Sequence, residues 1–133
     1  MIRVATKNDV PLVASLLLAM YCEVKSKDNL LLDQFESLAI KHIEEDEVWL
    51  YADKALYIMR DDTPCVERTK LWNGVSVYIA PELRGSTVLA KLYKHMFEHY
   101  EGTIMGFTEA NSLHNRVLLK RHKLLGFVYE MRR

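Results

Sequence analysis

The 133-residue chain has little of what builds disulfide-stapled, metal-binding or membrane-spanning proteins. Its two cysteines, Cys22 and Cys65, lack the spacing of a redox motif or a zinc site, so we expect neither a metal nor a disulfide framework. No apolar run is long enough to cross a bilayer, and the opening residues MIRVATKND contain no signal-peptide core. These absences predict a cytoplasmic protein in a reducing setting.

The chain also lacks an excess of charge of either sign. Lys plus Arg and Asp plus Glu number 18 each, so the formal net charge is zero. No overall field recruits nucleic acid or an anionic membrane, and we expect neither as a partner. Half of the residues are hydrophobic, and the length suits one domain with one core, residues 1–133.

Hydrophobic periodicity predicts a mixed α/β (α+β) domain in the order β-α-α-β-β-β-α-β-α-β, a single sheet of about six strands flanked by about four helices. The predicted strands are 2–5, 48–52, 55–59, 71–80, 103–108 and 127–131. The predicted helices are 10–24, 32–43, one from the Ser86 or Thr87 cap to Gly102, and 112–125.

Several local patterns add detail to this order. Thr6 and Asp9 have capping-box spacing, and Asp53-Lys54 is expected to turn the hairpin. The acidic run 44–47 is interpreted as a solvated connection. In the third helix, His95 and His99 are expected mostly on the side opposite the apolar stripe.

One strand-to-helix junction stands out as a candidate site. The stretch VYIAPELRGST joins a strand to a helix through Pro81 and Arg84-Gly85. Phosphate-binding turns are built in this way, with backbone N–H groups at a helix N-terminus, although they usually carry several glycines. The alternative is an ordinary turn in which Ser86 or Thr87 caps the helix.

The element order and three motifs resemble the GNAT superfamily of acyl-CoA-dependent N-acyltransferases. IRVATKNDVPLVASLL resembles the family's first strand and helix, VYIAPELRG its fourth strand and cofactor turn, and NRVLLKRHKLLGF its closing helix. In its shortness and its degenerate motifs the chain resembles members of phage type. The resemblance covers most of the chain.

The resemblance implies that acetyl-CoA is the co-substrate and that no metal takes part. The pyrophosphate would lie against the turn from Arg84 to Thr87, and the pantetheine arm would pair along the strand before it. The cofactor-binding residues implied in this way are Val77, Ile79, Arg84, Gly85, Ser86, Thr87 and Asn115.

Three features depart from the family pattern. Thr87 and Leu89 occupy positions where the family has small residues, and Leu89 is expected to crowd the turn. His122 stands where the family usually has tyrosine. The family usually ends in two strands after Gly-Phe, whereas only the strand 127–131 is predicted here before Arg133. The unpaired edge of this strand predicts a homodimer.

The resemblance also suggests catalytic residues. His122 lies two helical turns after Asn115 and would protonate the CoA thiolate, and Glu109 would act as the general base. Each has a structural alternative, His122 as an inert packing residue and Glu109 as an exposed loop residue. Tyr93 and Tyr129 are the other candidate acids.

Two functions remain open from the sequence. The first is an N-acyltransferase that moves an acetyl group from acetyl-CoA to an amine of a small molecule or protein. The second is a non-catalytic structural or binding protein on a GNAT-like fold, with a cofactor site eroded at Thr87 and Leu89.

Overall fold

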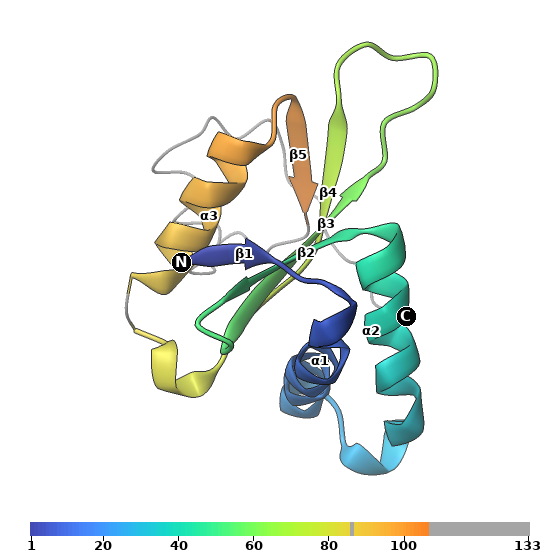
Figure 1. Ribbon diagram of the computed structural model, residues 1–133, viewed down its shortest axis with the longest axis vertical. Coiled ribbons are helices and arrows are strands. Elements are labelled where there is room, and N and C mark those ends of the chain that lie inside the picture. Colours follow the sequence, from blue (N-terminus) through green and yellow to red (C-terminus); the bar gives the residue numbers. More distant parts are fainter. Residues whose placement is uncertain (86, 107–133) are drawn as a thin grey trace.

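In the computed structural model, which describes residues 1–85 and 87–106, three α-helices cover the two faces of one five-stranded sheet (Figure 1). The strands are β1 (Ile2–Val4), β2 (Glu47–Tyr51), β3 (Ala55–Asp61), β4 (Leu71–Ile79) and β5 (Thr103–Gly106). The α-helices are α1 (Val10–Val24), α2 (Phe35–Glu45) and α3 (Val88–His99), with 3-10 turns η1 (Lys7–Asp9), η2 (Lys27–Asn29), η3 (Leu32–Gln34) and η4 (Pro81–Leu83).

The strands lie side by side in sequence order, β1-β2-β3-β4-β5, antiparallel except for the parallel pair β4–β5. This confirms the mixed α/β class and the first eight elements of the predicted order. The predicted helix 112–125 and strand 127–131 lie outside the described residues, and so does the edge on which the homodimer prediction rests. Among the described helices, none is long and apolar enough to cross a membrane.

The central strand β3 divides the core into two layers. Residues 55–59 are each at most 1% exposed. Leu56 and Ile58 pack with α1 and α2, whereas Tyr57 and Met59 pack with α3, because successive side chains of a strand point to opposite faces. The predicted apolar faces of α1 and α3 are confirmed, since Val13, Leu17, Leu92 and Met96 are among the buried residues.

A bulge in β4 changes which face its side chains reach. Ile58 pairs with Ser76 and Met59 pairs with Gly74, so β4 carries one extra residue, Val75. Val75 consequently packs on the α1 and α2 side, while Val77 packs on the α3 side. In the sequence, Val75, Val77 and Ile79 alternate with Ser76 and Tyr78, which predicts that Val75 and Val77 share a face. That prediction was wrong, because one inserted residue reverses an alternation of period two.

The entry into α1 follows the predicted capping motif. The Asp9 carboxylate accepts a hydrogen bond from the backbone N–H of Thr6 at 2.8 Å. The same carboxylate receives two hydrogen bonds from the Arg3 guanidinium, at 2.8 and 2.9 Å. The hydrogen bonds from Arg3 and Thr6 lower the pKa of Asp9 to about 2. This ion pair ties the edge strand β1 to the start of the first helix.

The sequence predicts that the acidic run 44–47 is a solvated connection. For Asp46 this prediction is wrong. The Asp46 side chain is only 2% exposed and accepts hydrogen bonds from Arg60 Nε at 2.9 Å and Nη2 at 3.2 Å. His42 Nδ1 lies 2.7 Å from Asp46 Oδ2, the oxygen that also accepts the hydrogen bond from Arg60 Nη2. The Arg60 and His42 hydrogen bonds outweigh burial and lower the pKa of Asp46. Asp46 therefore fastens the end of α2 to β3.

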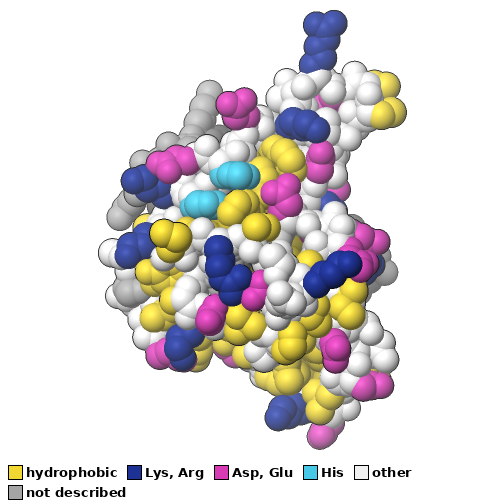
Figure 2. All heavy atoms as spheres, viewed as in Figure 1, with side chains coloured by type: hydrophobic (Ala, Val, Ile, Leu, Met, Phe, Trp, Pro, Cys, Tyr) yellow, Lys and Arg dark blue, Asp and Glu magenta, His cyan; other side chains and the backbone are white. Residues whose placement is uncertain are grey.

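A polar aromatic cluster lies under α3 and corrects the expected position of His95. The His95 Nδ1 atom is 2.7 Å from the Tyr57 hydroxyl, and its ring centroid is 4.6 Å from that of Trp49. Tyr100 accepts a hydrogen bond from Trp49 Nε1 and donates one to Glu47. His95 thus faces the sheet, because it follows Leu92 by three residues at the border of the apolar stripe. Figure 2 shows two histidines beside hydrophobic side chains on this surface.

The hairpin between β2 and β3 predicts a stabilising substitution. Its turn is formed by Ala52 and Asp53, one residue earlier than expected, with φ of 50° and 55°. Alanine pays a steric penalty in this left-handed region and glycine does not. We expect Ala52→Gly to raise the free energy of unfolding by about 0.5–1 kcal/mol in urea denaturation. The control Ala19→Gly, inside α1, should lower it by about 1 kcal/mol; equal losses in both variants would contradict this account.

The environment of His95 predicts a loss of stability in acid. Burial and the neighbouring His99 lower the pKa of His95. The unfolded chain therefore binds a proton that the folded chain resists, and the free energy of unfolding should fall as the pH drops below about 6.5. His95→Gln can still pair with Tyr57 but does not titrate, so its stability should fall less over that range. Urea denaturation at several pH values tests this, and identical pH profiles for the two proteins would overturn it.

Candidate functional site

The parallel strands β4 and β5 pair along the first part of β4. Their register runs from Leu71 with Thr103 to Gly74 with Gly106, the last residue that the structure describes before 107–133. Residues 76–79 of β4 pair with β3 on one side. Among the described residues, no strand pairs with them on the other side, which we call the β4 edge. The Val75 bulge lies at the start of this edge and bends and twists a strand locally.

The β4 edge leads directly into the predicted turn. β4 ends at Ile79, η4 follows, and α3 begins at Val88, so the N-terminus of α3 lies at the end of the β4 edge. Gly85 has a φ of +79°, and no atom lies within 4 Å of where its Cβ would be. Glycine suits this position because a side chain at positive φ is strained. The turn is exposed and compatible with an anion approaching the helix N-terminus.

Of the backbone N–H groups predicted to bind an anion at the turn, that of Arg84 is already hydrogen-bonded within the protein. The N–H of Arg84 is engaged within η4, where it donates to the Pro81 carbonyl at 3.2 Å. The N–H groups of Gly85 and Thr87 donate to no group of the described chain. Thr87 is the exposed N-cap of α3, without a side-chain capping bond, and its carbonyl accepts from Lys91 N–H at 3.0 Å. Gly85 and Thr87 are thus the described donors that an anion could use.

The Arg84 side chain is held by groups that sequence reasoning did not include. Its Nε donates to the Ile79 carbonyl at 2.9 Å, and its Nη2 donates to Glu23 Oε2 at 2.5 Å. The guanidinium carbon also lies 5.7 Å from the centre of the Tyr78 ring. The Arg84 hydrogen bond is the main cause of the lowered pKa of Glu23, and burial together with Glu23 raises the pKa of Tyr78. The positive charge at the turn is therefore paired with a carboxylate from the end of α1.

Of the other residues predicted for the site, the structure places two on β4 beside the turn and one in the core under α3. Val77 and Ile79 lie in residues 76–79 of β4, which no described strand pairs with on the β5 side, and their side chains pack towards α3. Leu89 is 6% exposed and packs into the same core. The expectation that its side chain crowds the turn is therefore wrong, because Leu89 shares the apolar helix face with Leu92. Ser86, Glu109, Asn115 and His122 lie outside the described residues.

Metal chemistry has no evident site in this part of the molecule. No group of three or more His, Cys, Asp or Glu side chains in residues 1–85 and 87–106 is placed to hold a metal ion. Tyr93, one of the alternative acids, belongs to α3 and is buried in the core that this helix forms with the sheet. Burial raises its pKa to about 12.

Comparison with known proteins gives matches of structure only. No family model matches the sequence, and no curated protein matches it. A possible acetyltransferase from Clostridium difficile 630 superposes with a TM-score of 0.74 at 16% identity, covering 99% of this chain and 96% of that one. A ribosomal-protein-alanine N-acetyltransferase from Brucella melitensis biovar Abortus 2308 has a TM-score of 0.66 at 14% identity, covering 99% and 97%.

A third solved structure is an aminoglycoside acetyltransferase from an uncultured soil metagenomic sample, in complex with sisomicin. Its TM-score is 0.65 at 11% identity, and the match covers 99% of this chain and 96% of that one. Identities of this size carry information on architecture alone. Together with the observed strand order, the parallel β4–β5 pair and the strand-turn-helix junction, they show that the chain has a GNAT-type fold.

Proposed function

We propose that the protein is an acetyltransferase that uses acetyl-CoA to acetylate an amine. The observation that carries this proposal is the junction in which β4 leads through η4 and Gly85, at positive φ, to the N-terminus of α3. An extended, amide-containing chain attached to a pyrophosphate fits such an arrangement from end to end. The acetyltransferase names of the structural neighbours support the same class of reaction.

The pantetheine arm would occupy the edge of β4. It contains two amide groups, which can pair with an exposed strand as an added peptide strand does. Residues 75–79 supply the backbone for this pairing, with Val77 and Ile79 within the stretch. The bulge at Val75 lies at the inner end, next to the last described pair of β4 and β5, Gly74 with Gly106. The thioester is proposed to lie near this point.

The phosphates would lie at the turn. The N–H groups of Gly85 and Thr87 donate there, together with the positive end of the α3 dipole. Ser86 completes the predicted turn. Arg84 positions this loop through the Ile79 carbonyl and Glu23, and it contributes less free charge than an unpaired arginine would.

The chemical step needs a neutral amine and a stabilised thiolate. On the basis of the sequence resemblance we propose Glu109 as the base that removes a proton from the amine. We propose His122 as the acid that protonates the CoA sulfur as the thioester breaks, and Asn115 as a pantetheine contact. The amine attacks the acetyl carbon, the C–S bond breaks, and CoA leaves as the thiol.

A non-catalytic binding protein on the same fold is the second candidate. The pairing of Arg84 with Glu23 favours it, because this arginine would otherwise supply charge to a phosphate. Thr87 in place of a small residue favours it as well. The two candidates differ in whether acetyl-CoA binds.

Binding of acetyl-CoA can be tested with a substitution that preserves the fold. We expect millimolar acetyl-CoA to raise the Tm of the unmodified protein, since a ligand at about 100 times its Kd adds about 2.7 kcal/mol to the free energy of unfolding. Thr87→Glu places a negative charge at the start of α3, where the dipole favours it by about 0.3–1 kcal/mol. The variant should be as stable as the unmodified protein yet lose most of the acetyl-CoA shift, because the carboxylate repels the pyrophosphate.

The control for that experiment is Lys94→Gln, which changes the net charge by the same amount at an exposed position in the second half of α3. It should keep the full acetyl-CoA shift. No shift in the unmodified protein at millimolar acetyl-CoA would overturn the proposed donor site and support the non-catalytic candidate. If both variants lost the acetyl-CoA shift of Tm equally, the loss would be due to the change in net charge and not to the turn.

The proposed acid predicts a selective kinetic effect. His122→Phe keeps an aromatic ring and removes the proton donor, so kcat should fall by about 10²-fold while the Kd for acetyl-CoA changes little. A panel of small-molecule amines and peptide N-termini, with release of the CoA thiol as readout, supplies the assay. His99→Phe, on α3, is the matched control and should retain kcat. An unchanged kcat in His122→Phe would remove His122 from the mechanism.

A further inference from the structure

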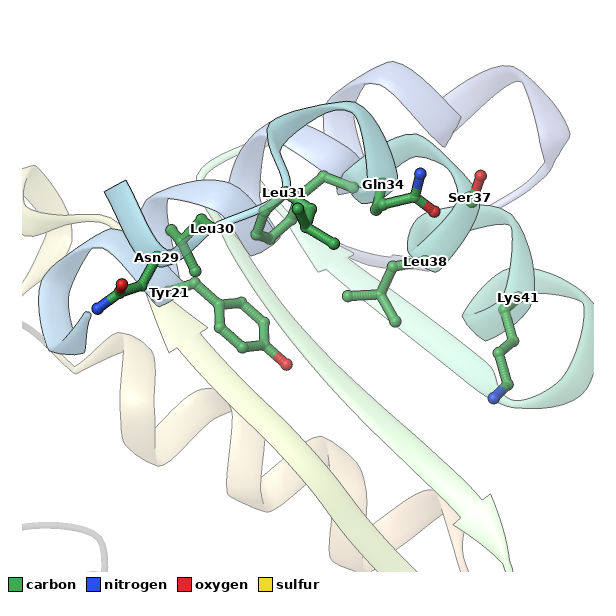
Figure 3. Close-up of a pocket in the computed structure, with 9 residues that line it drawn as sticks. Tyr21, Asn29, Leu30, Leu31, Gln34, Ser37, Leu38 and Lys41 are labelled. Carbon is green, nitrogen blue, oxygen red and sulfur yellow. The ribbon is translucent and has the colours of Figure 1, made fainter. Parts of the chain in front are cut away.

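A hollow of about 440 Å³ lies between the end of α1, the connection that follows it, and α2 (Figure 3). Its apolar wall is formed by Tyr21, Leu30, Leu31, Phe35 and Leu38, and Lys41 lies at one end. None of the residues that line it belongs to β4, β5 or the turn at Gly85. It is therefore built from different residues than the proposed acetyl-CoA site.

The wall of this hollow is part of the folded core. The rings of Tyr21 and Phe35 meet edge to face, with centroids 5.4 Å apart. Phe35 is buried, and Leu30 and Leu38 pack against the core formed with α1. Because these side chains are fixed by packing, the hollow does not need to form when a ligand arrives. Its volume falls within the range of about 300–1,000 Å³ that is usual for small-molecule sites.

The mouth of the hollow exposes apolar surface that the fold does not use. Leu31 is 72% exposed and the adjacent Leu32 is 51% exposed. Two consecutive leucines held in water beside an apolar wall form a continuous surface, unlike the single exposed apolar residues of most protein surfaces. A ligand in the hollow would cover this surface, and removing it from water would favour binding.

Among the described residues that line the hollow, Lys41 alone carries a charge. Lys41 makes no ion pair with any carboxylate of the described chain. A second cation, Lys25, lies with its Nζ 5.9 Å from the centre of the Tyr21 ring. Figure 3 shows Leu38 between Tyr21 and Lys41, so an apolar body placed on Leu38 can reach the ammonium group with its end. Gln34 and Ser37 add polar atoms to the rim.

We propose that this hollow binds a small amphipathic carboxylate. Its aliphatic or aromatic body lies against Tyr21, Leu30 and Leu38, and its carboxylate lies at Lys41. The apolar wall selects the body, while the lysine, with no competing acid in the lining, selects the negative head group. The proposal does not depend on acetyl-CoA binding at the turn.

The probe is decanoate, added to the full chain below its micelle concentration and followed by calorimetry and by NMR shifts. We expect saturable binding of one decanoate per chain with a Kd on the order of 10⁻⁴ M, as suits a ligand of about twelve heavy atoms. Decylammonium has the same tail and the opposite charge, and should bind at least tenfold more weakly. The shifts should centre on Tyr21 and Leu38.

Two variants and a control assign the binding to named residues. Lys41→Gln should weaken decanoate binding about three- to tenfold and reduce its advantage over decylammonium, because only the head-group contact is lost. Leu38→Asp should abolish binding of decanoate. Lys7→Gln removes an exposed lysine that does not line the hollow and should change neither affinity.

Four results would overturn the proposal. The first is the absence of saturable decanoate binding to the unmodified protein. The second is decylammonium binding as tightly as decanoate. The third is Lys41→Gln binding decanoate as tightly as the unmodified protein does. The fourth is self-association that decanoate does not disrupt and Leu31→Asp abolishes, which would assign the leucine surface to a second copy of the chain. Lys41→Gln alters one exposed side chain, so its result does not depend on a fold-disrupting change.

Discussion

The rest of the structure depends on the complete burial of residues 55–59 of β3. Its residues 55–59 are covered on both faces, which requires helices on each side of the sheet and hydrogen-bonded strands on each edge. Because side chains alternate along the strand, this one segment supplies both cores, Leu56 and Ile58 to one and Tyr57 and Met59 to the other. A polar side chain on either face would be left in a dry layer, where it costs free energy without a partner.

The same arrangement places the candidate donor site. β4 pairs with β3 on both sides of its bulge, and no described strand pairs with residues 76–79 on the other edge. The chain then turns at Gly85 into α3, whose N-terminus meets the end of that edge. Glu23 and Arg84 brace this junction from α1, so the helix layer on one face also positions the turn. A change in the packing of α1 would consequently shift Glu23 and, through Arg84, the position of the turn.

The formal net charge of the protein is zero, and several of its oppositely charged side chains form ion pairs. Arg3 with Asp9, Arg60 with Asp46 and Arg84 with Glu23 each join elements that are separate in the chain. The Asp46 pair is the most buried of these on its acidic side and fixes a helix end, while the more exposed pairs add less because water screens them. Lys41 differs, because it has no such carboxylate partner in the described part of the chain and lines an apolar hollow.

Sequence alone determined the element order through β5, the apolar faces of α1 and α3, and the Thr6–Asp9 motif, because periodicity and capping are decided by residues within one or two turns of each other. It also identified the strand-turn-helix junction at Gly85. Only the tertiary structure decided the Val75 bulge, the inward position of Leu89, the partners of Arg84 and the hollow beside Lys41. Each of these depends on register or on contacts between distant segments, such as Glu23 with Arg84, 61 residues apart, and no local pattern specifies which segments will meet.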